Sequence, residues 1–107
     1  MTTMKDRLRL GPEFRPEEYD RYRELVFGNL ERRLKRWQPE QVELELSVSG
    51  RETNSQRTVL ACRIAGVPTI VGTSILPDLD KAVVEVRNDV RRQINRWVTR
   101  KEAERRR

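Results

Sequence analysis

The chain has 107 residues, of which 36% are hydrophobic and 37% are charged, and its formal net charge at pH 7 is +6. This length suits one domain with its own core. The sequence has no apolar run long enough for a signal peptide or a membrane span, so we expect a cytoplasmic protein. One cysteine and no histidine exclude an internal disulfide, a structural zinc site and a Cys–His nucleophile, and no glycine-rich nucleotide-binding motif is present.

The first predicted elements are a short edge strand and a long amphipathic helix. Residues 5–10 alternate polar and apolar side chains before a Gly-Pro pair, which is typical of a weak strand. Over residues 17–37, apolar side chains recur at three- and four-residue steps and predict a helix that ends before Pro39. The buried stripe of this helix contains Tyr19, Tyr22, Val26, Phe27, Leu30, Leu34 and Trp37.

Three strands are predicted next. Residues 42–49 alternate apolar and polar side chains without a fault, and residues 57–65 and 67–73 are rich in apolar and β-branched side chains. A polar loop over residues 50–56 and a short Ala-Gly turn separate the three, and connections this short predict an antiparallel meander. The inward side chains of the first two of these strands are Val42, Leu44, Leu46, Val48, Thr58, Leu60, Cys62 and Ile64.

The last predicted element is a second amphipathic helix. Ser74 is expected to cap it, with Pro77 in its first turn. We expect Trp37 and Trp97 to pack in the core rather than to stack on bases, because both lie on apolar stripes. The stripe of the second helix contains Leu79, Val83, Val86, Val90, Ile94 and Trp97.

The predicted order is therefore β-α-β-β-β-α, an α+β fold in which two helices pack on one face of a four-stranded sheet. The other face, which carries Glu43 and Glu45, is expected to be solvated and more acidic. We assign residues 5–103 to a single domain. Residues 104–107 lack an apolar anchor and are expected to form a disordered basic tail.

Basic residues gather at the C-terminal ends of both predicted helices. Residues 91–107 hold eight basic and two acidic side chains, an excess of six that equals the net charge of the whole chain. Charge segregated in this way favours a polyanionic partner, above all RNA. In the second helix, Arg92, Arg96 and Arg100 line one flank, and Arg87 and Arg91 line the other.

Several short motifs in the two predicted helices resemble those of a known protein family. The first helix has Tyr22 followed by Leu30-Glu31-Arg32, and the second has Leu79-Asp80-Lys81-Ala82 near its start. Together with the element order and the loop over residues 50–56, these motifs resemble the ribosome hibernation-promoting factor family, also called ribosome-associated inhibitors or sigma-54 modulation proteins. The likeness covers roughly residues 8–102.

The resemblance implies a protein without catalytic activity that binds the small ribosomal subunit and its rRNA. It would occupy the channel used by mRNA and tRNA and hold translation silent, as in stress or stationary phase. By the same resemblance, Arg32, Arg91 and Arg92 would contact rRNA. The helical wheel adds further candidate RNA-binding residues, namely Lys35, Arg36, Arg87, Arg96 and Arg100. The chain would be a short form, without the additional domain with which long forms pair ribosomes.

Two alternatives stay open at this point. A general module for structured RNA would carry the same basic surface. A diverged paralogue could instead act as a protein–protein regulator or a homodimer through its sheet. We expect no cofactor, no metal, no membrane and no small-molecule substrate, and the sequence leaves the oligomeric state undecided.

Overall fold

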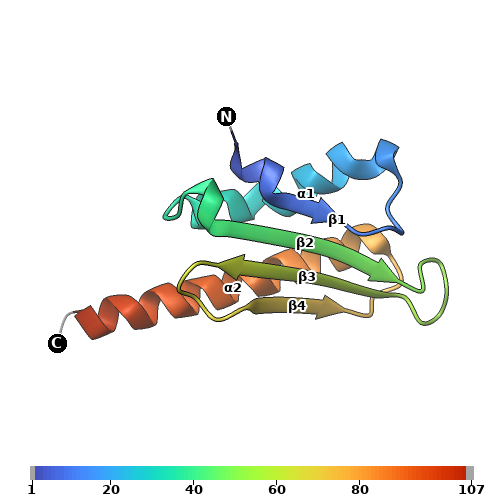
Figure 1. Cartoon of the computed structure of the whole chain (residues 1–107). Helices are drawn as coiled ribbons and strands as arrows, with labels where there is room; N and C mark the ends of the chain where they lie inside the picture. Colours follow the sequence, from blue (N-terminus) through green and yellow to red (C-terminus); the bar gives the residue numbers. More distant parts are fainter. Residues whose placement is uncertain (1, 106–107) are drawn as a thin grey trace.

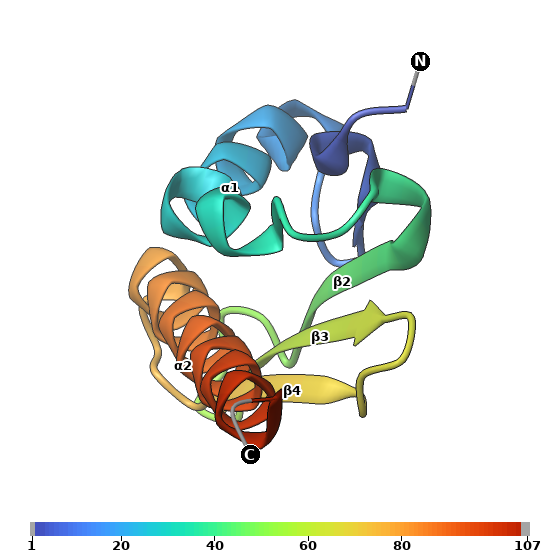
Figure 2. The same cartoon turned by 90° about the vertical axis from the view of Figure 1, so that its left-hand side faces the viewer.

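Four strands form one mixed sheet, and two helices cover one of its faces, in the computed structural model, which describes residues 2–105 (Figures 1 and 2). The predicted α+β class and the order β-α-β-β-β-α are confirmed. The main elements are β1 (Leu8–Leu10), α1 (Tyr19–Leu34), β2 (Val42–Ser49), β3 (Arg57–Ile64), β4 (Ile70–Ser74) and α2 (Leu79–Arg105). Short 3-10 turns at Met4–Arg7, Pro16–Glu18 and Pro39–Gln41 precede β1, α1 and β2.

The strands lie in the sheet in chain order. β1 pairs in parallel with β2, with Leu8 opposite Leu44, whereas β2, β3 and β4 form the predicted antiparallel meander. Gly66, in the turn after β3, has a φ of +79°, a conformation that glycine adopts without a Cβ penalty. Because β1 and β2 are parallel, α1 is the crossover connection between them.

The core lies between the inner face of the sheet and the apolar stripes of the two helices. Every inward side chain predicted on β2 and β3 is buried, and so are the middle members of both helical stripes. The end members of the stripes, Tyr19, Trp37, Leu79 and Trp97, are only half-buried. Alternation and helical periodicity therefore identified the core correctly, except at its margins.

The second helix begins later than predicted. Ser74 belongs to β4, where its Oγ accepts a hydrogen bond from the backbone N–H of Leu76 at 3.2 Å. The cap is instead Asp78, whose Oδ1 accepts a hydrogen bond from the backbone N–H of Lys81 at 3.1 Å. Pro77 therefore precedes the helix, which begins at Leu79 directly after the Asp78 cap.

The other boundaries differ by a few residues. Residues 16–18 form a 3-10 turn, so α1 proper runs only over residues 19–34. At the other end, α2 includes residues 104 and 105, which the sequence assigns to a disordered tail. The same prediction for residues 106–107 lies outside the described part of the chain.

The outer face of the sheet is solvated, as predicted, but it is balanced in charge rather than acidic. Glu43 lies opposite Arg63 on β3, and Glu45 lies opposite Arg9 on β1. Each exposed glutamate of β2 thus has a basic cross-strand neighbour. Over the described residues, no helix is both long enough and apolar enough to cross a membrane.

Candidate nucleic-acid interface

The two helices lie side by side and run in the same direction (Figures 1 and 2). Near their starts, Arg21 of α1 forms an ion pair with Asp80 of α2. Toward their C-terminal ends, the helices are joined by a second ion pair. Arg36 lies just past the end of α1, and its Nη2 is 2.7 Å from Oε1 of Glu102 on α2. The arginine-rich C-terminal ends of both helices therefore meet at one end of the molecule.

We call this region the basic end. The helix α2 has 27 residues, and its last turns extend beyond the sheet at this end (Figure 1). The exposed cations of the basic end are Arg32, Arg33, Lys35, Arg36, Arg96, Arg100, Lys101 and Arg105. Two of them pair with nearby carboxylates, Arg36 with Glu102 and Lys101 with Glu104. The other six have no ion pair among residues 2–105, so their charge is available to a partner.

A groove between the helix ends lies within this cluster. It encloses about 260 Å³, and Arg32, Arg33 and Arg36 from the end of α1 line one side. The polar side chains of α2 that line the other side are Asn95, Thr99 and Glu102, and Glu102 is the ion-pair partner of Arg36. The three guanidinium groups, the Asn95 amide and the Thr99 hydroxyl supply hydrogen-bond donors, which phosphate oxygens need, and Arg36 neutralises Glu102.

The two tryptophans meet beside this groove. The ring centroids of Trp37 and Trp97 are 6.2 Å apart, with the ring planes tilted by 49°. Trp37 packs against the core cluster as predicted, whereas Trp97 is not among the side chains packed on that cluster. The Nζ of Lys101 lies 5.7 Å from the centroid of the Trp97 ring, within cation–π range.

The structure brings together five of the eight predicted RNA-binding residues. They are Arg32, Lys35, Arg36, Arg96 and Arg100, and all five are exposed. Arg91 is half-buried, and Arg92 is exposed but lies one turn before the cluster. The prediction missed Arg33, Lys101 and Arg105, although the basic runs in which they stand were visible in the sequence.

Arg87 differs from the other predicted residues, because its donors are used within the protein. Its Nη1 donates to the backbone carbonyl of Leu25 at 3.0 Å, and Nε and Nη2 donate to Oδ1 of Asn88 at 3.3 and 3.2 Å. Its partial burial, together with the charge of Arg91, lowers the pKa of the guanidinium. Arg87 therefore joins the two helices and is not part of the basic end.

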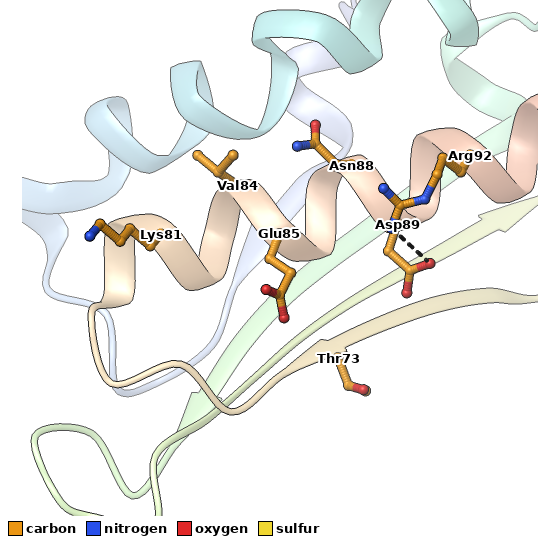
Figure 3. Close-up of a pocket in the computed structure, with 7 residues that line it drawn as sticks. All are labelled: Thr73, Lys81, Val84, Glu85, Asn88, Asp89 and Arg92. Atoms are coloured by element: carbon orange, nitrogen blue, oxygen red, sulfur yellow. Dashed lines mark ion pairs between the residues drawn. The ribbon is translucent and has the colours of Figure 1, made fainter.

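A larger hollow than this groove lies elsewhere, between the first half of α2 and β4 (Figure 3). It encloses about 550 Å³ and is lined by side chains of both charges, including Lys81, Glu85 and Asp89. Arg92 turns back over it toward Asp89, with 3.8 Å between Nη2 and Oδ1 (Figure 3). Because two acidic and two basic side chains line this hollow, it lacks the uniform positive field of the basic end.

Cations at helix C-termini also have a structural explanation. The partial negative charge of a helix C-terminus favours basic side chains in the last turn, where α1 has Arg32 and Arg33 and α2 has Arg105. This effect is confined to the last turn. Arg96 and Arg100 lie more than one turn before the end of α2, so the helix dipole does not account for them.

Comparison with family models, with curated proteins and with solved structures finds no match for this chain. Within residues 2–105 there is no group of three His, Cys, Asp or Glu side chains that could hold a metal ion. The basic end and the motifs of the sequence are therefore the features from which a function can be inferred.

Proposed function

We propose that the protein binds the small ribosomal subunit through the basic end and holds translation silent. The observation that carries the proposal is the parallel arrangement of α1 and α2, which places eight exposed cations at one end of the molecule. The sequence resemblance to the hibernation-promoting factors supplies the ribosome as the partner. The proposed site of action is the cytoplasm, where ribosomes translate.

The proposed mechanism is steric and involves no covalent step. The molecule measures 50 × 32 × 19 Å along its principal axes, and the basic end lies at one end of the long dimension (Figure 1). Phosphate contacts at this end would anchor the domain to rRNA, and the folded body would then exclude mRNA and tRNA from the channel. Affinity would come mainly from release of counterions, and selectivity from fit to the shape of the folded RNA.

Co-sedimentation with purified small subunits across a salt series tests the proposal, with bulk double-stranded RNA as competitor. We expect saturable binding near one protein per subunit that resists the competitor. Binding should weaken at high salt, with a log–log slope of about −0.7 per phosphate neutralised. Binding that any RNA abolishes would favour the general RNA-binding module instead.

A pair of charge-matched variants locates the contact. Arg96→Glu with Arg100→Glu changes the basic end by four charge units, and Arg57→Glu with Lys81→Glu makes the same change at exposed positions outside it. We expect the first variant to lose binding and the second to retain it. Equal affinity of both for the subunit would contradict the proposed interface. Absence of binding by the unaltered protein at moderate salt would turn the search to protein partners of the sheet.

A further inference from the structure

Trp97 borders a second hollow, on the side away from the groove between the helices. This hollow encloses about 290 Å³ between α2 and the segment that leads into β4. We propose that it binds an unpaired RNA base, which would stack on Trp97 while Arg96 and Arg100 hold the adjoining phosphates. This inference rests on the proposed function in one respect, namely that RNA is the ligand.

The walls of the hollow suit an aromatic ligand. Pro68, Ile70 and Trp97 supply apolar surface, and Ile70 is only 6% exposed, so it belongs to the core and forms a fixed floor. Gln93 closes one side, and its Nε2 donates to the backbone carbonyl of Val71 at 2.9 Å. That hydrogen bond holds the amide in place at the edge of β4, so this wall is positioned before any ligand arrives.

Trp97 lies at the margin of the core, beside Trp37. It stays half-buried, and it does not join the packed cluster to which Trp37 contributes. A large aromatic ring kept partly exposed among arginines is a suitable platform for a base, because every base has a π-face. The prediction that both tryptophans pack in the core is thus satisfied by Trp37 alone.

The charges around the ring complete the site. Arg96 and Arg100 are four residues apart, so they lie on the same face of α2, and both side chains line this hollow. Both are exposed and have no ion pair among the described residues. A base inside a duplex is stacked and paired and cannot enter such a hollow, so the site would select single strands, loops or bulges.

Tryptophan fluorescence tests the inference directly. The chain has two tryptophans, so the Trp37→Phe variant reports on Trp97 alone. This variant would be titrated at low salt with a short single-stranded RNA and with an abasic ribose-phosphate strand of the same length and charge. We expect the RNA to quench the emission of Trp97 and to bind from about 5-fold to about 100-fold more tightly than the abasic strand.

The Trp97→Leu variant should lose that difference and bind both strands with the affinity of the abasic one. The quenching comparison keeps Trp97 in place, so it remains decisive should Trp97→Leu fail to fold. Equal quenching and equal affinity for the two strands would overturn the base site while leaving phosphate binding by the basic end intact. Binding of neither strand, nor of the ribosomal subunit, would overturn the proposed function as well.

Discussion

Arg87 of α2 donates a hydrogen bond to the backbone carbonyl of Leu25 on α1, with 3.0 Å between Nη1 and the oxygen. The contact joins the middle of α1 to the first half of α2, between the ion pair of Arg21 with Asp80 and that of Arg36 with Glu102. An arginine that the sequence groups with the RNA-binding residues thus has a structural task. Substitution of one arginine of α2 should therefore lower stability, whereas substitution of another should lower RNA affinity.

We expect Arg87→Met to lower the free energy of unfolding by about 1–2 kcal/mol, because a half-buried charged hydrogen bond is lost while the aliphatic packing is kept. RNA affinity should not change. Arg96→Met, at an exposed position, should change stability by no more than about 0.5 kcal/mol and weaken RNA binding. Urea unfolding and an RNA titration of both variants check this. Weaker RNA binding by an Arg87→Met protein of unchanged stability would place Arg87 in the interface.

We expect replacement of glycine by alanine to have opposite effects on stability at two positions, Gly72 and Gly28. A Cβ on Gly72 of β4 would lie 2.7 Å from the backbone carbonyl oxygen of Val86, so α2 and the sheet would have to separate. We expect Gly72→Ala to cost about 1–3 kcal/mol of stability. Gly28 is an exposed helical position whose Cβ would meet only Nη1 of Arg87, at 3.5 Å. Gly28→Ala should therefore stabilise the protein by about 0.5–1 kcal/mol.

Thermal unfolding of the two glycine variants beside the unaltered protein gives the sign of each effect. A Gly72→Ala protein as stable as the original would show that α2 can move away from β4 without loss of packing. A destabilised Gly28→Ala protein would instead indicate that the added methyl group displaces Arg87 from its bond to Leu25.

Acid should remove one specific contribution to stability. Arg51 holds Glu18 by two hydrogen bonds, of 2.8 Å from Nη1 to Oε1 and 2.6 Å from Nη2 to Oε2. These bonds, with one from the backbone N–H of Arg15, lower the pKa of Glu18 from 4.5 to about 2. The folded state therefore binds this proton less readily than the unfolded state, so the contribution is present above pH 4.5 and is lost as the pH falls toward 2.

The Glu18→Gln variant isolates that contribution. Its stability should fall less steeply than that of the unaltered protein between about pH 4.5 and pH 2, because one carboxylate with a lowered pKa is missing. Urea unfolding at a series of pH values measures both slopes. Parallel slopes for the two proteins would contradict the assignment of the lowered pKa to Glu18.

Cys62 should be unreactive in the folded protein. It is fully buried on the inner face of β3, and this burial raises the pKa of its thiol to about 12. Since the thiolate is the reactive species, an aromatic disulfide reagent at pH 8 should label Cys62 only as fast as the fold opens. The time course of labelling, with and without denaturant, checks this. Rapid labelling without denaturant would mean that β3 and α2 separate readily.

The chain determined the elements and their buried faces by local pattern. Strict alternation placed Val42, Leu44 and Leu46 inward, and the three- and four-residue steps of both helices identified buried residues such as Leu30 and Val90. These periodicities follow from backbone geometry within one element, so they need no knowledge of neighbours. The helix boundary was misplaced where two capping residues competed, since Ser74 and Asp78 are both favoured caps and only the extent of β4 decides between them.

The candidate site is divided in the same way. That each helix ends in a cluster of arginines is visible in the chain without any structure. That the two clusters meet depends on the packing of the whole fold. β1 and β4 run in the same direction as β2, so the helices that follow them, α1 and α2, both run opposite to it (Figure 1). The structure also decided that Arg87 joins the helices and that Trp97 lies outside the core. Such contacts link residues far apart in the chain, and their geometry depends on how the elements pack, which a local pattern does not encode.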